Sequence, residues 1–253
     1  MSMRQFDTSR NSLTGQQVDQ LILAETDRFK REKMIESWVD DGNIPDFLSD
    51  FYPLNITSKE GKILTLFVSR EYLCFGDDSK HTLTPMFPTT AQSICDKLNC
   101  VMPTPKIVDM IWKSATIKLT PEPWGPPYDA SMMSSMRIVE HNRRIEVQRS
   151  KTRYTVSDLI AGHKKDVVIA NGISKHRDKV FIYGWHQSNG NVIQPLSDPH
   201  ENHYADYSHS VRLVSKSSLL DGSPINTIDV YQDSKLSKLV SNEGPLTSVA
   251  YFT

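Results

Sequence analysis

Cysteine is scarce in this chain, and the few cysteines lie in a pattern that excludes two common structures. Only Cys74, Cys95 and Cys100 occur among the 253 residues, without a CxxC pair or the paired spacing of a zinc ribbon. Neither a disulfide framework nor a cysteine-based zinc site is therefore expected. We predict reduced and partly buried thiols, while the short spacing of Cys95 and Cys100 leaves a single bridge across a turn open.

An excess of charge of one sign is also missing, as is any long apolar run. The 29 lysines and arginines nearly balance the 30 aspartates and glutamates, so no general attraction to nucleic acid or to anionic membranes is expected. No stretch has the length and apolar character of a membrane span. The N-terminus lacks the apolar core and cleavage site of a signal peptide, which predicts synthesis in the cytosol and leaves the final location open. The absence of internal repeats excludes solenoids and propellers.

The remaining composition, 38% hydrophobic and 23% charged, is typical of a globular protein. We predict an α+β fold in two parts: an N-terminal helical arm at 1–50 and a single α+β domain at 51–253. The arm is predicted because Thr14–Trp38 carries apolar residues at roughly helical spacing on a charged background. We expect it to pack on the domain or on a partner chain.

Within the domain, the sequence predicts a hairpin, short helices and a strand-rich C-terminal half. Strands at 51–57 and 62–76 form the hairpin. Two short helices follow, the first capped by Thr89 or Thr90 and the second by Thr104. A mainly antiparallel C-terminal sheet is expected from strands at 165–173, 179–186, 191–196 and 209–215, with a last helix near 233–244.

The segment 119–133, LTPEPWGPPYDASMM, contains four prolines and a glycine. This composition excludes a helix and a central strand, so we expect a long, semi-rigid loop. Such loops often border a cleft, which makes Trp124 and Tyr128 candidate ligand contacts. The alternative is that their rings pin the loop to the body of the domain.

Histidines gather in one part of the sequence: six of the eight lie between His163 and His209. His163, His186 and His209 each stand where a loop joins a predicted strand. If the strands that carry His186 and His209 are antiparallel neighbours, both side chains rise from the same rim of the sheet. Rigid sheets commonly present catalytic groups on their connecting loops, so this recurrence favours a site for acid–base or metal chemistry.

We predict a catalytic group made of His186, Asp206, His209, His163 and Asp166. His186 and His209 serve as base or metal ligand, Asp206 orients an imidazole, and His163 and Asp166 lie close by. The structural alternative is a satisfied polar network at the edge of the sheet.

Zinc is the cofactor that these residue types suit, because imidazole and carboxylate ligands bind it and three protein ligands leave a position for water. The predicted ligands are His186, His203, Asp206 and His209. No HExxH motif occurs, so such a site belongs to another class. Without a metal, Ser208 and His209 are a poor nucleophile–base pair, since adjacent strand residues point to opposite faces. Cys74 or Cys95 then remains as an alternative nucleophile.

Substrate contacts are predicted beside these histidines. Aromatic and guanidinium groups supply large contact surfaces and fixed hydrogen-bond donors. The predicted substrate-binding residues are Trp124, Tyr128, Trp185, Tyr207 and Arg212.

Four ordered blocks resemble a widespread family of bacterial and fungal proteins without a characterised function. The blocks are LTPMFPTTAQSICDKLNCVMPTPKIVDMIW, AGHKKDVVIANGI, KVFIYGWHQSNGNVIQPL and HYADYSHSVRLV. The resemblance covers about 51–214 and implies no activity. Ser210 stands where the family pattern has a glycine, so the tight turn expected there is not implied for this chain.

Two interpretations of function follow. The first is a hydrolase with a His/Asp site, metal-assisted or metal-free, that acts on a cell-wall peptide or glycan. The second is a non-enzymatic binding or structural module, docked to a protein partner through the N-terminal arm. A nuclease or phosphoesterase is disfavoured by the near-neutral charge. A hydrolase requires His186, Asp206 and His209 within reach of each other in an open cleft, whereas a scaffold leaves them apart or sealed.

Overall fold

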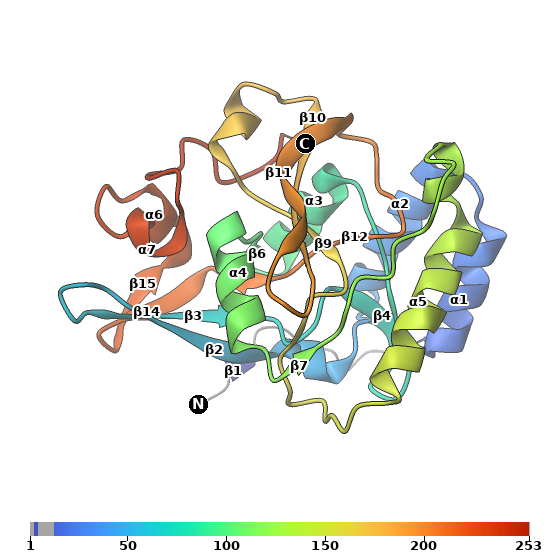
Figure 1. The fold of residues 1–253 in the computed structure, drawn as a ribbon, viewed down its shortest axis with the longest axis horizontal. Helices are drawn as coiled ribbons and strands as arrows, with labels where there is room; N and C mark the ends of the chain where they lie inside the picture. Colours follow the sequence, from blue (N-terminus) through green and yellow to red (C-terminus); the bar gives the residue numbers. More distant parts are fainter. Residues whose placement is uncertain (1–2, 5–12, 253) are drawn as a thin grey trace.

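A computed structural model describes residues 3–4 and 13–252 (Figure 1). The first residues of the predicted arm, 1–2 and 5–12, lie outside the described residues, as does much of the stretch assessed for a signal peptide. Within the described part, helices combine with mainly antiparallel sheets, which confirms the predicted α+β class. None of the helices in that part has both the length and the apolar character needed to cross a membrane.

The helices are α1 (Gly15–Ala24), α2 (Arg28–Asp40), α3 (Pro88–Lys97), α4 (Pro105–Ser114), α5 (Ser135–Arg149), α6 (Thr227–Gln232) and α7 (Ser237–Val240), with 3-10 turns at Asp46–Ser49, Ala130–Met133 and Asn171–Ser174. The strands are β1 (Met3–Arg4), β2 (Asp50–Thr57), β3 (Ile63–Val68), β4 (Cys74–Gly76), β5 (His81–Leu83), β6 (Cys100–Val101), β7 (Ile117–Lys118), β8 (Ile160–Ala161), β9 (Lys165–Val167), β10 (Lys179–His186), β11 (Val192–Glu201), β12 (His209–Ser210), β13 (Val214–Ser215), β14 (Ser217–Leu220) and β15 (Ser223–Asn226).

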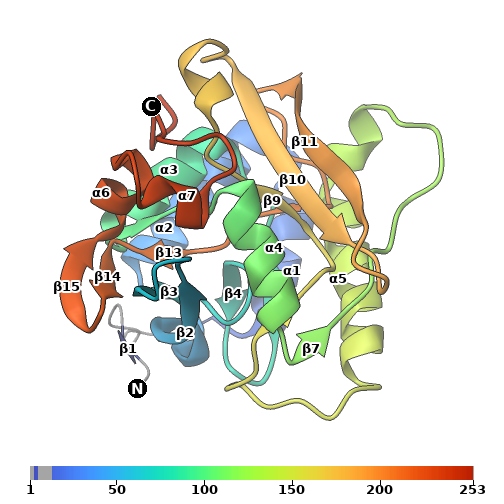
Figure 2. The same ribbon diagram turned by 60° about the vertical axis from the view of Figure 1, so that its left-hand side comes forward.

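Two sheets dominate the described residues. The larger one follows the order β1-β2-β3-β13-β6, and β14 joins it by pairing with both β3 and β15. The smaller one has the order β11-β10-β9-β12, and its last pair, β9 and β12, is parallel. Figure 2 shows β10 and β11 as a long hairpin that passes beside α4. The predicted hairpin forms from β2 and β3, with Tyr52 opposite Val68 and Thr57 opposite Ile63. Its second strand ends at Val68, and Cys74–Gly76 forms β4 in a separate sheet with β5 where one strand over 62–76 was expected.

The N-terminal helices are built into the hydrophobic core. The single predicted helix is instead two, because the chain leaves the helical conformation at Glu25 and Asp27 caps α2 through the backbone N–H groups of its first turn. Val18, Ile22 and Ile35 are fully buried in the same core as the sheet residues. The described part of the arm therefore packs on the main domain, one of the two arrangements expected, and α1 lies beside α5 (Figure 1).

Of the two predicted helix caps, the cap of α4 is confirmed and the cap of α3 is wrong. Thr104 caps α4 as expected: its hydroxyl accepts the N–H of Ile107, and Pro105 takes the first helical position. The predicted cap of α3 at Thr89 or Thr90 is wrong, because the helix already begins at Pro88. A proline at that position has the required φ and no N–H that needs a cap.

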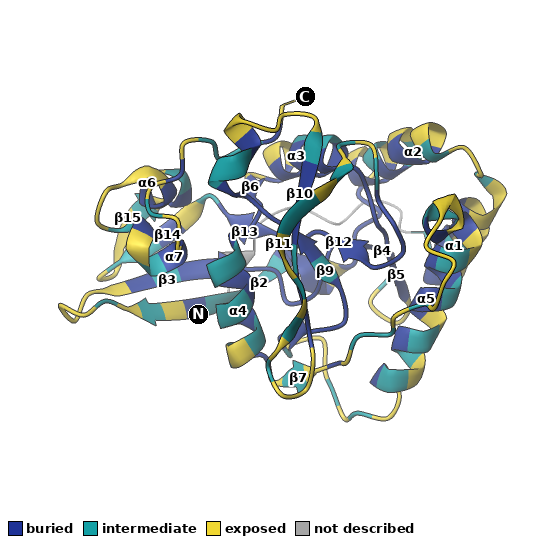
Figure 3. Cartoon of the chain, turned by 45° about the horizontal axis from the view of Figure 1, so that its top comes forward, coloured by how far each residue is buried: buried dark blue, intermediate teal, exposed yellow. Residues whose placement is uncertain are grey.

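The C-terminal half departs from the prediction where the alternating run 209–215 was expected to form one strand. The chain belongs to the smaller sheet at β12 and to the larger sheet at β13, and between them Arg212 donates to the carbonyls of Ser69 and Ile160, at 3.0 and 2.8 Å. These carbonyls supply the hydrogen-bond partners that a buried guanidinium needs. The alternating pattern of 209–215 therefore belongs to a segment that crosses from one sheet to the other. Figure 3 shows this central region as buried.

All three cysteines are free thiols, as expected, and they are fully buried where partial burial was predicted. The bridge that the spacing of Cys95 and Cys100 left open is not formed. Burial raises the pKa of the Cys74 thiol well above its usual range, and it raises the pKa of the Cys95 thiol as well. Neither thiol is activated as a nucleophile, because activation requires a lowered thiol pKa.

Candidate functional site

Three chain segments that are distant in sequence meet at the centre of the molecule. They are 69–72, which follows β3, 160–167, which contains β8 and β9, and 206–212, which contains β12. Tyr72 donates its hydroxyl hydrogen to Asp166 Oδ2 at 3.0 Å, and Lys164 donates from Nζ to the carbonyl of Tyr207 at 2.7 Å. These contacts tie Asp166 and the segment of Asp206 and His209 to one buried polar region, in which the predicted catalytic residues fall into separate groups.

Asp206 and His209 form the first group of predicted site residues. The Asp206 carboxylate accepts hydrogen bonds from the Ser208 N–H (2.8 Å) and hydroxyl (2.5 Å), and from the Tyr204 hydroxyl (3.2 Å). His209 Nε2 lies 4.0 Å from Asp206 Oδ2. Neither ring nitrogen of His209 has a hydrogen-bond partner among the described residues, and the side chain is fully buried. We call these two residues the Asp206–His209 couple.

The charge states of this group are strongly perturbed. Burial by itself raises the pKa of Asp206, but His209, Lys165 and the Ser208 hydrogen bonds outweigh it and hold this pKa at about 2. Burial lowers the pKa of His209 to about 4, against the raising effect of Asp206. Burial also lowers the pKa of Lys164 to about 7. At neutral pH the couple therefore consists of a carboxylate and a neutral imidazole, and such a concentration of shifted groups marks a candidate functional site.

Aromatic side chains gather beside the couple. The ring of Tyr207 lies 5.4 Å from that of Trp124, 6.4 Å from Trp185 and 4.9 Å from His141, measured between centroids. We call these four residues the aromatic group. Three of them were predicted as substrate contacts. The fourth, His141, was not anticipated from the sequence.

Trp124 also pins the proline-rich loop to the body, because its backbone N–H donates to the Tyr207 hydroxyl at 2.6 Å. Together with the edge-on contact between the Trp124 and Tyr207 rings, this hydrogen bond corresponds to the structural alternative for Trp124. Tyr128, further along the same loop, is 78% exposed. The two candidate residues of the loop therefore differ, and only Tyr128 projects freely into solvent.

Cationic side chains surround the aromatic group. The guanidinium of Arg144 lies 3.9 Å from the centre of the Trp124 ring and that of Arg137 lies 5.0 Å from it. Lys165 Nζ lies 4.8 Å from the centre of the Trp185 ring. Arg144 also pairs with Glu140 at 3.5 Å, so part of this positive charge is compensated locally.

His141 is the residue of this site that sequence reasoning missed. It lies on α5, fully buried, with both ring nitrogens lacking hydrogen-bond partners among the described residues. Burial, followed by the charges of Lys164 and His163, holds its pKa well below the usual range. A usable signal exists in the sequence: Ile138, His141 and Ile145 share one face at helical spacing, but only once 135–149 is recognised as a helix.

His186 belongs to a second group, separate from the couple. Its Nε2 lies 2.9 Å from Asp109 Oδ1, which also accepts the Tyr183 hydroxyl at 2.9 Å, and its ring stacks on Trp112 with centroids 5.3 Å apart. The expectation that His186 and His209 rise from neighbouring antiparallel strands is wrong, because β9 lies between β10 and β12. Local patterns do not encode this strand order.

His163 belongs to a third group, built around a buried ion pair. The Arg149 guanidinium lies 2.7 Å from Glu71 Oε2, and both side chains are about 1% exposed. His163 Nε2 lies 3.4 Å from the other oxygen of Glu71, and Arg149 NH1 lies 2.9 Å from His81 Nε2. Burial alone would raise the pKa of Glu71, but His163 and Arg149 bring it well below the usual range. Burial and the neighbouring Arg149 charge lower the pKa of His81 to about 3.

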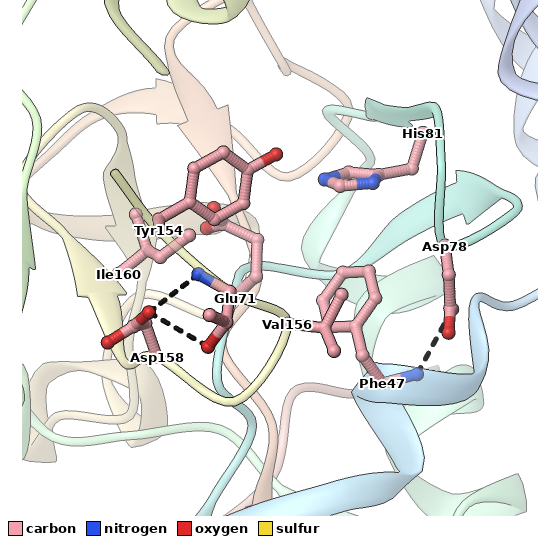
Figure 4. Close-up of a pocket in the computed structure, with 9 residues that line it drawn as sticks. Phe47, Glu71, Asp78, His81, Tyr154, Val156, Asp158 and Ile160 are labelled. Carbon is pink, nitrogen blue, oxygen red and sulfur yellow. Dashed lines mark hydrogen bonds between the residues drawn. The ribbon is translucent and has the colours of Figure 1, made fainter. Parts of the chain in front are cut away.

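Glu71 of this ion pair lines a small cavity of about 10 Å³ (Figure 4). Glu71 and His81 reach it from the core, while Tyr154 and Asp158 come from the segment that follows α5. No local sequence pattern indicates this arrangement, because Glu71 and Arg149 are 78 residues apart. Glu71, Arg149 and His81 contact one another, but both ring nitrogens of His163, His81 Nδ1 and Arg149 Nε have no hydrogen-bond partner among the described residues.

The remaining predicted residues, Asp166, Arg212 and His203, make contacts with other parts of the fold. Asp166 is buried against Tyr72, and burial raises its pKa to about 7. Arg212 is fully buried, with its guanidinium 4.1 Å from the centre of the Tyr72 ring. His203 is exposed, and its ring faces Phe29 at 6.3 Å. Arg212 therefore does not reach a substrate at the surface.

The four predicted metal ligands are not brought together. Asp206 and His209 are close, but His186 pairs with Asp109 and His203 lies against Phe29. In the part of the chain that the structure describes, no group of three or more His, Cys, Asp or Glu residues is arranged to hold a metal ion. Zinc remains a prediction that rests on the residue types alone.

Comparison with known proteins adds no relative: no family model, no curated protein and no solved structure matches this chain. The resemblance of the KDVVI, YGWH and DYSH blocks to an uncharacterised family therefore stays a prediction. The function must be argued from the site itself.

Proposed function

We propose that this protein is a hydrolase that uses the Asp206–His209 couple for general acid–base catalysis. The observation that carries the proposal is the neutral, unpartnered imidazole of His209 beside a carboxylate that is kept ionised. A base needs a free lone pair, and a neighbouring carboxylate stabilises the imidazolium that forms when the base takes a proton. Buried histidines that are purely structural usually have hydrogen-bond partners.

The reaction class is the attack of water on an acyl or glycosyl carbon. His209 takes one proton from the water as its oxygen bonds to the carbon, and Asp206 stabilises the resulting imidazolium. The same proton then passes from His209 to the leaving group as the scissile bond breaks. Lys165, half-buried and positively charged near the couple, stabilises negative charge that develops in the transition state.

The proposed substrate is a peptide or glycan polymer. The aromatic group, together with the exposed ring of Tyr128, offers flat apolar surfaces on which sugar rings or side chains stack. Because His209 is fully buried, the loop 119–133 must lift from Tyr207 before substrate reaches the couple. The hydrogen bond from Trp124 to Tyr207 then holds the loop closed over the site.

A second candidate function is a binding module without catalysis. The complete burial of His209 and the separation of His186 from it favour this alternative, since a sealed and divided set of residues was expected for a scaffold. In that case the exposed Tyr128 and the cations beside Trp124 form the binding surface, and no proton transfer occurs.

Turnover of cell-wall polymers by a His209→Gln variant separates the two functions. Purified protein is incubated with peptidoglycan and with soluble peptide and glycan polymers, and released ends are quantified. We expect the variant to lose roughly 100-fold or more in rate, as for removal of a general base. The matched control is His203→Gln, which removes an exposed imidazole, and circular dichroism verifies that both variants fold.

Equal rates for the wild type and His209→Gln would contradict the assignment of the couple. Retention of wild-type protein on the polymers without any release of ends would favour the binding module. Elemental analysis of the same preparations tests the zinc prediction separately, with His209→Gln expected to lose any metal that His209 binds.

A further inference from the structure

A basic groove lies at the end of the molecule that carries the turn between β2 and β3. It has a volume of about 930 Å³ and is bounded by that turn on one side and by the segment from Asp233 to Leu239, which includes most of α7, on the other. Figures 1 and 2 show both elements at the same end of the fold. The volume is within the range of known ligand sites, about 300–1,000 Å³. The groove contains none of the residues of the candidate catalytic site.

Four lysines border the groove: Lys59, Lys62, Lys235 and Lys238. All four are exposed, and none forms an ion pair among the described residues. Their positions are fixed by local hydrogen bonds of the backbone. Ser58 accepts the N–H groups of Glu60 and Lys62, and Asp233 accepts those of Lys235 and Leu236.

Leucines add an apolar component to this groove. Leu220, Leu236 and Leu239 line it and are only partly buried, so the described residues leave part of their surface uncovered. A groove that combines ammonium groups with aliphatic side chains complements a ligand that carries both carboxylates and apolar groups.

We propose that this groove binds an acidic, leucine-rich peptide segment of a partner protein. Charge complementarity with the four lysines selects carboxylates, and the leucines receive the apolar side chains between them. Glu60 and Asp233 also line the groove and alternate with the lysines. Alternating charge in a concave surface favours a peptide over a uniformly anionic membrane or a nucleic acid, which are bound by unbroken positive surfaces.

Fluorescence anisotropy with a defined probe tests the proposal. The probe is a short labelled peptide of alternating glutamate and leucine, and its matched control has glutamine in place of glutamate. The full-length protein is compared with a double variant, Lys62→Glu with Lys238→Glu. A second double variant, Lys151→Glu with Lys175→Glu, makes the same charge change at exposed lysines outside the groove.

We expect the acidic probe to bind the wild-type protein and the control variant equally, and the groove variant at least about tenfold more weakly. Binding should also weaken as salt is raised. Absence of probe binding, or equal binding by the groove variant, would overturn the proposal. Preferential binding to vesicles of phosphatidylcholine and phosphatidylserine would replace it by a membrane contact. Polymer hydrolysis should be unchanged in the groove variant, so failure here leaves the proposed catalytic function untouched.

Discussion

Low pH should reduce the stability of this protein because its buried neutral imidazoles resist protonation. His209 is the residue for which the size of this effect is easiest to calculate. Its pKa in the folded protein is about 4, whereas an exposed imidazole has a pKa of about 6.5. Between these two pH values the unfolded chain binds a proton at this residue and the folded chain does not. The free energy of unfolding therefore falls as the pH falls through this window, and above about pH 6.5 this residue has no such effect.

The magnitude follows from the size of the pKa shift. One pH unit corresponds to about 1.4 kcal/mol for one proton, so a shift of about 2.5 units destabilises the folded state by about 3 kcal/mol once the pH reaches about 4. This is a large part of the total stability of an ordinary domain, which is about 5–15 kcal/mol. His81, His141 and His163 also have lowered pKa values and act in the same direction.

Urea unfolding at a series of pH values isolates the share of His209. Glutamine cannot take up the proton, so the His209→Gln variant should lose about 1.4 kcal/mol per pH unit less than the wild type between about pH 6 and pH 4.5. His203→Gln is the control, because that imidazole is exposed. Parallel pH profiles for the wild type and His209→Gln would refute the account of a neutral, desolvated imidazole.

Two further predictions concern the packing around the site. Arg149→Met leaves the buried Glu71 carboxylate without its main partner and should lower the free energy of unfolding by about 3–5 kcal/mol. The double variant Glu71→Gln with Arg149→Met should recover part of this loss. Equal stabilities of Arg149→Met and the wild type would contradict a buried pair. Ile22→Ala should cost about 2–5 kcal/mol in urea unfolding, since this side chain of the N-terminal region is fully buried, whereas Leu23→Ala, at a residue that is 46% exposed, should cost less than about 1 kcal/mol.

Elements with strong local signals were predictable from the sequence. The apolar run KVFIYGWH forms β10 as expected, and Thr104 with Pro105 marks the start of α4. In contrast, α5 was not predicted, because only a few apolar residues, such as Ile138 and Ile145, lie on its buried face among many charged ones. The many charged residues obscure the helical spacing of these apolar residues, which becomes clear only from their burial in the fold.

The candidate site was predictable only in part, for a related reason. Asp206 and His209 are three positions apart in the sequence, so their turn could be predicted from the local pattern. The aromatic residues Tyr207 and Trp185 lie next to Asp206 and His186 in the sequence, and their rings meet in the fold. Strand order is a global property, and the position of β9 between β10 and β12 separated His186 from the couple. Glu71 was beyond reach, since its partner Arg149 lies on a distant segment, and His141 was accessible only once 135–149 is recognised as a helix.

The hydrogen bonds of Arg212 link the site to the order in which the chain folds. The guanidinium joins carbonyls that are 143 and 52 residues earlier in the chain, at Ser69 and Ile160. Contacts across such separations carry a high loop-closure entropy and tend to form late. The segment 206–212, which carries the Asp206–His209 couple, is therefore expected to dock late, after the segments that hold Ser69 and Ile160.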